Sequence, residues 1–315
     1  MSDALPSLIV ITGPTGIGKT RLAIDLAKTY STEIISCDSR QFYRELNIGV
    51  APPSVEEMET VPHHMVGFLS VRDTYNAHRF ENDVLGLCRK LFQLSNRVIM
   101  AGGSGLYIHA VTHGIDDLPD PDPALRLQLK EKLRTEGIES LQLQLKSVDP
   151  VYYLEVDTKN PNRLLRALEV SITAGQPFSS LRTKQSVTRP FQAIMIGLMT
   201  TREDLYQRIN QRVDQMMEDG LLDEVRSLYA YKEFNALNTV GYKELFSFLD
   251  GTYSLADAVE KIKTNTRRYA KRQLTWLKKD PGIRWFDPAD LDAIQEYIKG
   301  REVMRRDGGD EETKA

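Results

Sequence analysis

The chain has 315 residues, of which 41% are hydrophobic, and its formal net charge is −3. This length suits one large domain or two modest ones with a sizeable core. Two cysteines, Cys37 and Cys88, are too few for a disulfide framework and lack the paired spacing of a zinc site, which favours a reducing compartment. No apolar stretch approaches the about 18 residues that would cross a bilayer, so we expect a cytoplasmic protein without a membrane partner.

The first part of the chain alternates apolar strands with helices. Strands are predicted over 8–12 and 33–37, and a helix over 18–30 joins them in a βαβ unit. A charged helix over 79–94 leads to another apolar strand over 97–101, which ends in the glycine turn GGSGLY. This order of elements predicts an α/β fold whose parallel sheet is flanked by helices.

The middle of the chain is predicted to be helical. It begins at LPDPDPALRLQLKEKL, where Pro and Asp mark a linker and a helix start, and it continues with helical apolar spacing. The next strand is expected only at 193–198. We therefore expect an all-helical insertion domain at 118–185 within a discontinuous core formed by 1–117 and 186–304.

The last part of the chain carries segregated charge. Helices are predicted over 202–217, 223–231, 241–249 and 254–279. Residues 261–279 hold eight Lys or Arg and no Asp or Glu, so the small net charge does not exclude a nucleic-acid partner. The acidic, glycine-rich tail at 305–315 is expected to be disordered.

Residues 13–20 read GPTGIGKT and match the phosphate-loop pattern GxxxxGK[ST] in its usual place between a strand and a helix. The glycines let backbone amides converge on an anion, and the helix N-terminus adds partial positive charge. Lys19 is predicted to reach the terminal phosphate and Thr20 to ligate Mg²⁺. The residues expected to bind a diphosphate here are Gly13, Pro14, Thr15, Gly16, Ile17, Gly18, Lys19 and Thr20.

The phosphate loop alone does not identify the ligand. It recognises the geometry of a diphosphate, and ATP is only the commonest molecule that carries one. The strand at 97–101 ends without the acidic residue that most phosphate-loop NTPases place there, whereas the strand at 33–37 is followed by Asp38. Asp38 is expected at the carboxyl edge of the sheet, facing the phosphate site. From the motif alone it is a metal-shell group, a kinase base or a base for another nucleophile.

Seven ordered signatures resemble the tRNA dimethylallyltransferase family. They are GPTGIGKT, CDSRQFYRELNIGVAPP, VPHHM, AGGSGLY, NRLLRALEV, GYKEL and KRQLTWLK. The resemblance implies that dimethylallyl diphosphate is the donor, with its diphosphate in the loop, and that Mg²⁺ is the cofactor. The acceptor it implies is the N6 amine of the adenosine 3′-adjacent to the anticodon, in tRNAs that read codons beginning with U.

The resemblance also assigns catalytic roles. Asp38 matches the aspartate that takes the proton of the amine as the new bond forms, and Lys19 helps to neutralise the departing diphosphate. Ser104 stands where most members carry threonine, and it keeps the hydroxyl near the reacting amine. Arg208 and Arg212 are four residues apart on one helix face, and one or both are expected to reach the diphosphate.

An adenine stacked in an anticodon loop must be turned outward before it reacts, so a second surface must hold the RNA. The resemblance places these contacts in DSRQ, in the glycine turn and in NRLLR of the insertion, and the basic helix at 261–279 is expected to meet the RNA backbone. Tyr269 and Trp276 have a spacing more typical of core, and the histidine pair at 63–64 is expected to be structural or to position substrate. The residues expected to bind tRNA are Asp38, Ser39, Arg40, Gln41, Ser104, Arg126, Asn162, Arg163, Leu164, Leu165 and Arg166.

Three other functions stay open on the sequence. An isopentenyltransferase for free AMP shares the chemistry but needs neither the helical insertion nor the long basic helix. A small-molecule kinase would use Asp38 as base to a hydroxyl and turn over ATP, and a nucleotide-dependent switch would leave Asp38 dispensable. For the tRNA enzyme we expect a monomer whose partner is the anticodon stem-loop.

Overall fold

The computed structural model describes residues 5–120, 122–183 and 187–307. The chain divides into two compact units. One holds the residues up to His113 and from Thr188 onward, and the other is Gly114–Val187. The second unit encloses the segment 118–185 in which the sequence predicts an insertion.

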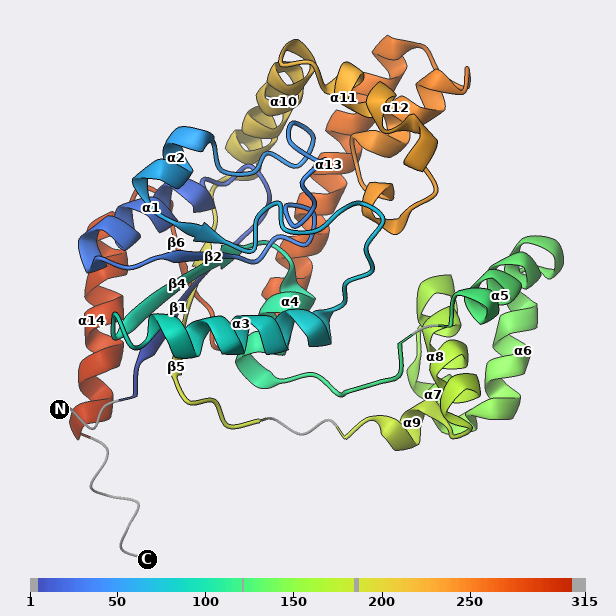
Figure 1. Cartoon of the computed structure of the whole chain (residues 1–315), viewed down its shortest axis with the longest axis horizontal. Coiled ribbons are helices and arrows are strands. Elements are labelled where there is room, and N and C mark those ends of the chain that lie inside the picture. Colours follow the sequence, from blue (N-terminus) through green and yellow to red (C-terminus); the bar gives the residue numbers. More distant parts are fainter. Residues whose placement is uncertain (1–4, 121, 184–186, 308–315) are drawn as a thin grey trace, which may run out of the picture. The chain divides into compact units, whose positions relative to one another are not determined.

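The first unit is built on a parallel sheet whose strands follow the order β3-β2-β4-β1-β5-β6 (Figure 1). The strands are β1 (Ser7–Thr12), β2 (Ile34–Ser36), β3 (His63–His64), β4 (Arg97–Gly102), β5 (Gln192–Leu198) and β6 (Arg284–Phe286). β5 follows the second unit in the chain and pairs directly with β1, at the centre of the sheet. The predicted parallel α/β sheet is confirmed, although the short edge strands β3 and β6 were not predicted.

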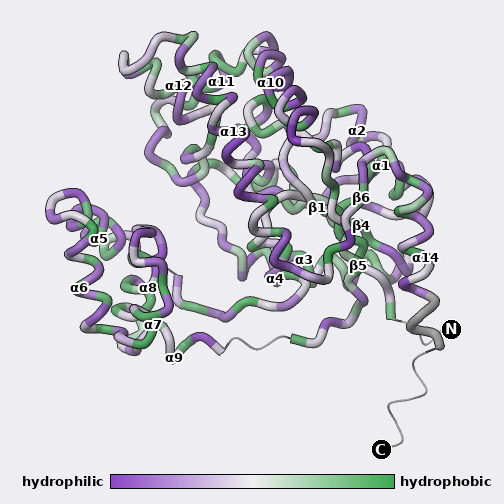
Figure 2. The backbone as a smooth tube through the Cα atoms, turned by 180° about the vertical axis from the view of Figure 1, so that it is seen from behind, coloured by the Kyte–Doolittle hydropathy of each residue, from purple (hydrophilic) through white to green (hydrophobic). Residues whose placement is uncertain are grey.

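Helices lie on both faces of this sheet, and others pack beyond it. The helices of this unit are α1 (Lys19–Tyr30), α2 (Val55–Thr60), α3 (Ala77–Leu91), α4 (Gly105–His113), α10 (Arg202–Glu218), α11 (Leu221–Ser227), α12 (Tyr242–Leu249), α13 (Leu255–Leu277) and α14 (Leu291–Asp307), with the 3-10 helices η1 (Tyr229–Tyr231) and η2 (Asn235–Leu237). Alternate residues of β1 pack into the hydrophobic cores on opposite faces of the sheet. Leu8 and Val10 belong to the core that includes α3 and α4, whereas Ile9 and Ile11 belong to the core with α1 and α14. Figure 2 shows hydrophobic residues along the strands of this sheet.

Two C-terminal predictions need correction. The helix predicted over 223–231 is interrupted after Ser227 and resumes as η1. The tail was predicted to be disordered from 305, but α14 continues as helix through Asp307. Residues 308–315 lie outside the described residues.

The second unit is helical and has its own core. Its helices are α5 (Pro123–Glu136), α6 (Ile138–Val148), α7 (Pro150–Glu155), α8 (Pro161–Ala174) and α9 (Phe178–Leu181). Three of them begin with an Asp or Asn cap followed by proline, which is favourable because proline lacks an amide that the first turn would leave unpaired. Leucines from α5, α6 and α8 fill the centre of the unit.

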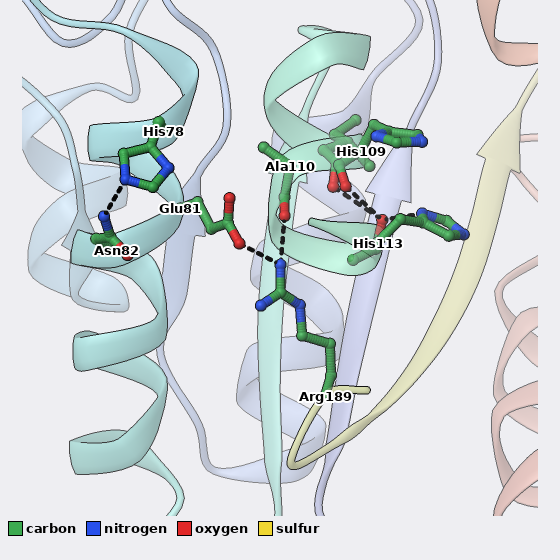
Figure 3. Close-up of polar contacts among 9 residues, drawn as sticks. His78, Glu81, Asn82, His109, Ala110, His113 and Arg189 are labelled. Atoms are coloured by element: carbon green, nitrogen blue, oxygen red, sulfur yellow. Dashed lines mark hydrogen bonds and ion pairs between the residues drawn. The ribbon is translucent and has the colours of Figure 1, made fainter. Parts of the chain in front are cut away.

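A buried ion pair fixes the point at which the chain re-enters the first unit. Arg189 follows Thr188 directly and lies between α3 and α4 (Figure 3). Its guanidinium donates to Glu81 Oε1 at 2.5 Å and to the carbonyl of Ala110 at 2.6 Å. The side chains of Arg189 and Glu81 are only 8% and 9% exposed. The chain that returns from the second unit is thereby joined to α4, the helix after which the chain leaves the first unit.

Candidate active site

The carboxyl ends of the central strands meet at one edge of the sheet. β1 runs into the phosphate loop, β2 into Asp38 and β4 into the glycine turn, and Thr12 pairs with Gly102 across the sheet. Together with α10 these ends surround a cavity of about 560 Å³. The predicted site residues that line the cavity are Thr15, Gly16, Gly18, Lys19, Thr20, Asp38, Gln41, Arg208 and Arg212.

The phosphate loop is held in place by contacts on both of its sides. Gly13 has a φ of +149° and lies so close to β5 that a Cβ would sit 2.8 Å from the carbonyl of Leu198. Ile17, which was expected to help bind the diphosphate, is fully buried and anchors the loop in the core. Lys19 Nζ reaches across the phosphate loop and donates to the carbonyls of Gly13 at 3.1 Å and Pro14 at 2.8 Å. The loop is therefore preorganised.

Positive charge in the cavity comes from Lys19 and Arg212, which are half-buried, and from Arg208, which is exposed. The pKa of Lys19 is lowered to about 8, mainly by burial; Asp38 opposes this shift and Arg212 adds to it. Burial also lowers the pKa of Arg212, again opposed by Asp38. Arg208 lies at the mouth of the loop, with Nη1 3.5 Å from the carbonyl of Ile17. The partly desolvated cations Lys19 and Arg212 favour an anionic ligand more strongly than fully solvated cations do.

Asp38 faces the same cavity. Its Oδ1 accepts the backbone N–H of Arg40 at 3.0 Å, which fixes the orientation of the carboxylate. Among the described residues no donor contacts Oδ2, so this oxygen is available to accept a proton from a ligand. The Asp38 carboxylate and the phosphate loop thus line the same cavity, although β2 and β1 are separated by β4 in the sheet.

The other residues of the DSRQ stretch have mainly supporting contacts. The Ser39 amide donates to Ser104 Oγ at 3.0 Å, so this hydroxyl joins the β2 and β4 loops. Arg40 was expected to contact tRNA, but its guanidinium donates to the carbonyls of residues 235 and 236 at 2.9 and 3.1 Å. Gln41 lines the cavity and donates to the carbonyl of Ala51 at 2.9 Å. Only Asp38 and Gln41 of this stretch line the cavity itself.

The loop at 47–51 lies within the signature CDSRQFYRELNIGVAPP, but no role in the site was predicted for its residues. The turn at 47–49 directs three backbone amides at the carboxylate of Glu224, at 2.8, 2.8 and 3.1 Å. Tyr242 donates to the same carboxylate at 2.6 Å, and Gly49 lies so close that a Cβ would be 2.6 Å from the tyrosine ring. This anchor presents Val50 and Ala51 to the cavity, where they supply apolar lining.

Two glutamines of α10 also line the cavity. Gln211 and Gln215 share a helix face with Arg208, because the spacings of three and four residues place side chains on one side. The same spacing rule that singled out the arginines would have found them from the sequence.

Of the residues predicted to bind tRNA in the second unit, some are exposed and others are buried. Asn162 and Arg163 are exposed at the start of α8. Leu164 and Leu165, at 0% and 3% exposure, are core residues of this unit, which corrects their expected place among the RNA-facing side chains. Arg166 donates to the carbonyl of Pro119 at 3.0 Å.

Arg126 makes an ion pair within the same unit. Its Nη1 lies 3.3 Å from Glu169 Oε2, and the Glu169 side chain is fully buried. Burial raises the pKa of Glu169, whereas Arg126 and then Arg166 lower it. Arg126 therefore already has a structural role, and Arg163 is left as the most accessible arginine of the NRLLR stretch.

The basic helix α13 has both buried and exposed aromatic contacts. Trp276 was expected in the core, yet it is 40% exposed and covers the start of α4, where a Cβ on Gly105 would lie 2.2 Å from its ring. Tyr269 is partly buried, and burial, with a smaller contribution from Asp38, raises its pKa to about 12. The helix thus packs on the site with one face.

The histidine pair has local partners. His64 Nε2 lies 2.5 Å from Glu33 Oε2, and His63 Nδ1 lies 2.8 Å from the carbonyl of Val61. Within the part of the chain that is described, no three His, Cys, Asp or Glu side chains are grouped to hold a metal. Nor does any helix there have the length and apolarity to cross a membrane.

Comparison with known proteins decides the family. Residues 41–280 match the family model described as IPP transferase. The chain belongs to the IPP transferase family. The tRNA dimethylallyltransferase of Christiangramia forsetii is 51% identical over 295 residues, which cover 93% of this chain and 98% of that relative. The tRNA dimethylallyltransferase 1 of Bacteroides thetaiotaomicron is 48% identical, with 94% and 96% covered.

Solved structures of the family share the fold. The tRNA isopentenylpyrophosphate transferase of Bacillus halodurans is 34% identical, has a TM-score of 0.71 and covers 96% of this chain and 98% of its own. A eukaryotic dimethylallyltransferase acting on tRNA is 27% identical, with a TM-score of 0.74 and 95% and 78% covered. The IPP transferase family therefore accounts for both units of the chain.

Proposed function

We propose that this member of the IPP transferase family transfers a dimethylallyl group from dimethylallyl diphosphate to the N6 amine of the adenosine 3′-adjacent to the anticodon, in tRNAs that read codons beginning with U. One observation carries the proposal: the phosphate loop, two arginines and the Asp38 carboxylate line a single cavity. Relatives that match nearly the whole chain are named tRNA dimethylallyltransferases, and this supports the same reaction here.

The reaction breaks the allylic C–O bond of the donor and forms a bond from that carbon to N6. Negative charge then grows on the departing diphosphate, and the loop amides, Lys19 and Arg212 stabilise it. The amine loses a proton as the new bond forms, and Asp38 Oδ2 accepts it. Arg208 and Arg212 sit on the α10 side of the cavity, which suits them to hold the diphosphate between helix and loop.

The donor groups of the cavity fit Mg²⁺. Thr20 and Asp38 both line it, and Mg²⁺ prefers hard oxygen ligands and is commonly held by one or two protein groups together with substrate phosphates. Thr20 would hold the ion through its hydroxyl. When bound, the ion supplies further neutralisation of the diphosphate charge.

The tRNA acceptor is favoured over free AMP by the second unit and by the basic helix. Arg163 is exposed at the start of α8, and α13 carries most of the basic run at 261–279. A free nucleotide makes no use of either surface, whereas RNA phosphates attract both. ATP as phosphoryl donor is not favoured, because the named relatives transfer a prenyl group.

The test incubates the purified chain and Mg²⁺ with labelled dimethylallyl diphosphate and either an anticodon stem-loop RNA or AMP. We expect label in the RNA, release of diphosphate and no transfer to AMP. A parallel reaction with ATP and no prenyl donor should show no turnover. Transfer to AMP alone, or consumption of ATP without RNA alkylation, would refute the proposal.

A further inference from the structure

A buried glutamine joins two loops of the site that are far apart in the sequence. Gln273 belongs to α13 and is 7% exposed. Its Oε1 accepts the backbone N–H of Thr15 in the phosphate loop at 2.9 Å. Its Nε2 donates to the carbonyl of Gly103, in the turn after β4, also at 2.9 Å. Both halves of the carboxamide are therefore used.

The fit around this carboxamide is close. A Cβ on Gly103 would lie 2.3 Å from Gln273 Nε2 and 3.2 Å from the carbonyl of Gly13, so only glycine leaves room for the bridge. The site needs one acceptor and one donor at the end of a side chain of this length. Glutamine provides both in neutral form, whereas an ionised glutamate is acceptor-only and lysine is donor-only.

The bridge continues to the catalytic carboxylate. Gly103 precedes Ser104, whose hydroxyl accepts the amide of Ser39, and Ser39 follows Asp38 in the chain. A short path of hydrogen bonds and peptide bonds thus runs from the phosphate loop through Gln273 to the loop of Asp38. Gln273 does not line the cavity, so it acts through the loops and not on the substrate.

We propose that Gln273 is a positioning residue that sets the placement of the donor diphosphate relative to the Asp38 base. The inference rests on the proposed prenyl transfer. Transfer requires the allylic carbon, the amine and the base to be aligned, and small misplacements of bound groups cost up to about 10²-fold in rate. Of the described groups that bind the donor, the bridge contacts only the Thr15 amide; Lys19, the arginines and the other loop amides do not touch Gln273. Loss of the bridge should therefore lower kcat more than it raises the KM for the donor.

The main variant is Gln273→Met, which keeps the length of the side chain and removes the carboxamide. We expect kcat to fall by about 10²-fold while the donor KM stays within about threefold. Gln93→Met, at an exposed position, is the matched control and should leave both constants unchanged. Unchanged kcat in Gln273→Met, or a raised donor KM with unchanged kcat, would overturn the proposal.

Gly103→Ala tests the same bridge from the other side, because its methyl group displaces the carboxamide while the glutamine remains. It also serves if Gln273→Met does not fold. We expect the same loss of kcat, and the double variant should lose no more than either single one, since both remove one interaction. Additive losses would contradict the bridge.

The activity of the wild-type protein distinguishes failure of the proposed function from failure of the role of Gln273. If it does not prenylate the stem-loop RNA, the proposed function fails. If it does and the variants match it, only the role of Gln273 fails. Binding of inorganic diphosphate, followed by calorimetry, should be alike in wild type and Gln273→Met.

Discussion

At the scale of single residues, Asp38 is the group on which the proposed chemistry depends. Asp38→Asn keeps an oxygen for the Arg40 amide but removes the base, so we expect kcat to fall by about 10² to 10⁴-fold. Single-turnover kinetics with stem-loop RNA measure this loss, and calorimetry with inorganic diphosphate should show retained binding. Asp292→Asn, at an exposed position of α14, is the control. Full activity of Asp38→Asn would remove the carboxylate from the mechanism.

Lys19 gives the donor site a dependence on pH. Burial lowers its pKa to about 8, so the ammonium is charged below that pH and neutral above it. We expect the affinity of the free enzyme for diphosphate to be retained up to about pH 7.5 and to decline as the pH rises past 8. Calorimetry across pH 7 to about 9.5 measures the decline. Lys19→Arg stays charged throughout, so comparison with it removes the titration of the ligand itself. Parallel profiles for the two proteins would rule out Lys19 as the cause.

At the scale of elements, the features that the sequence predicted are those formed by residues close together in the chain. The phosphate loop was predictable because strand, glycines and helix follow one another, and Asp38 because it directly follows a strand. Gln273 and Glu224 were not, since their partners lie more than a hundred residues away and each resembles an ordinary polar residue of an amphipathic helix. Leu164 and Leu165 were assigned to RNA by motif, although helical periodicity places them in the core.

Glu224 is the anchor of the loop that presents Val50 and Ala51 to the cavity. Glu224→Gln loses at least one of three amide contacts, because a carboxamide has only one acceptor oxygen. We expect a loss of about 1 to 3 kcal/mol in the free energy of unfolding, because the amides of the turn lose a hydrogen bond to a charged acceptor. Urea unfolding measures it, with Glu203→Gln at an exposed position as control. Equal stability of the two variants would show that the turn at 47–49 does not need the carboxylate.

Arg163 is the exposed cation of α8 and should act through RNA phosphates. Arg163→Gln is expected to raise the KM for stem-loop RNA. The slope of log KM against log salt concentration should also become smaller, by about 0.7 to 0.9 for each phosphate contact that is lost. Kinetics at several salt concentrations measure the slope. Arg89→Gln, at an exposed position of α3, is the matched control. An unchanged slope would assign the RNA contact to other residues.

At the scale of the whole molecule, the chain leaves and re-enters the first unit at points joined by Arg189. Because Arg189 and Glu81 are both buried, removal of one partner leaves the other as an unpaired charge inside the protein. Arg189→Met should therefore cost about 3 to 5 kcal/mol in the unfolding of the first unit.

The double variant Glu81→Gln with Arg189→Met separates the ion pair from mere packing. It removes both charges, so it should recover much of the stability that Arg189→Met loses, and the two changes should be strongly non-additive in urea unfolding. Arg226→Met breaks an exposed ion pair with Asp223 and should change stability little. Additive losses from Glu81→Gln and Arg189→Met would show that the ion pair does not secure the re-entry of the chain.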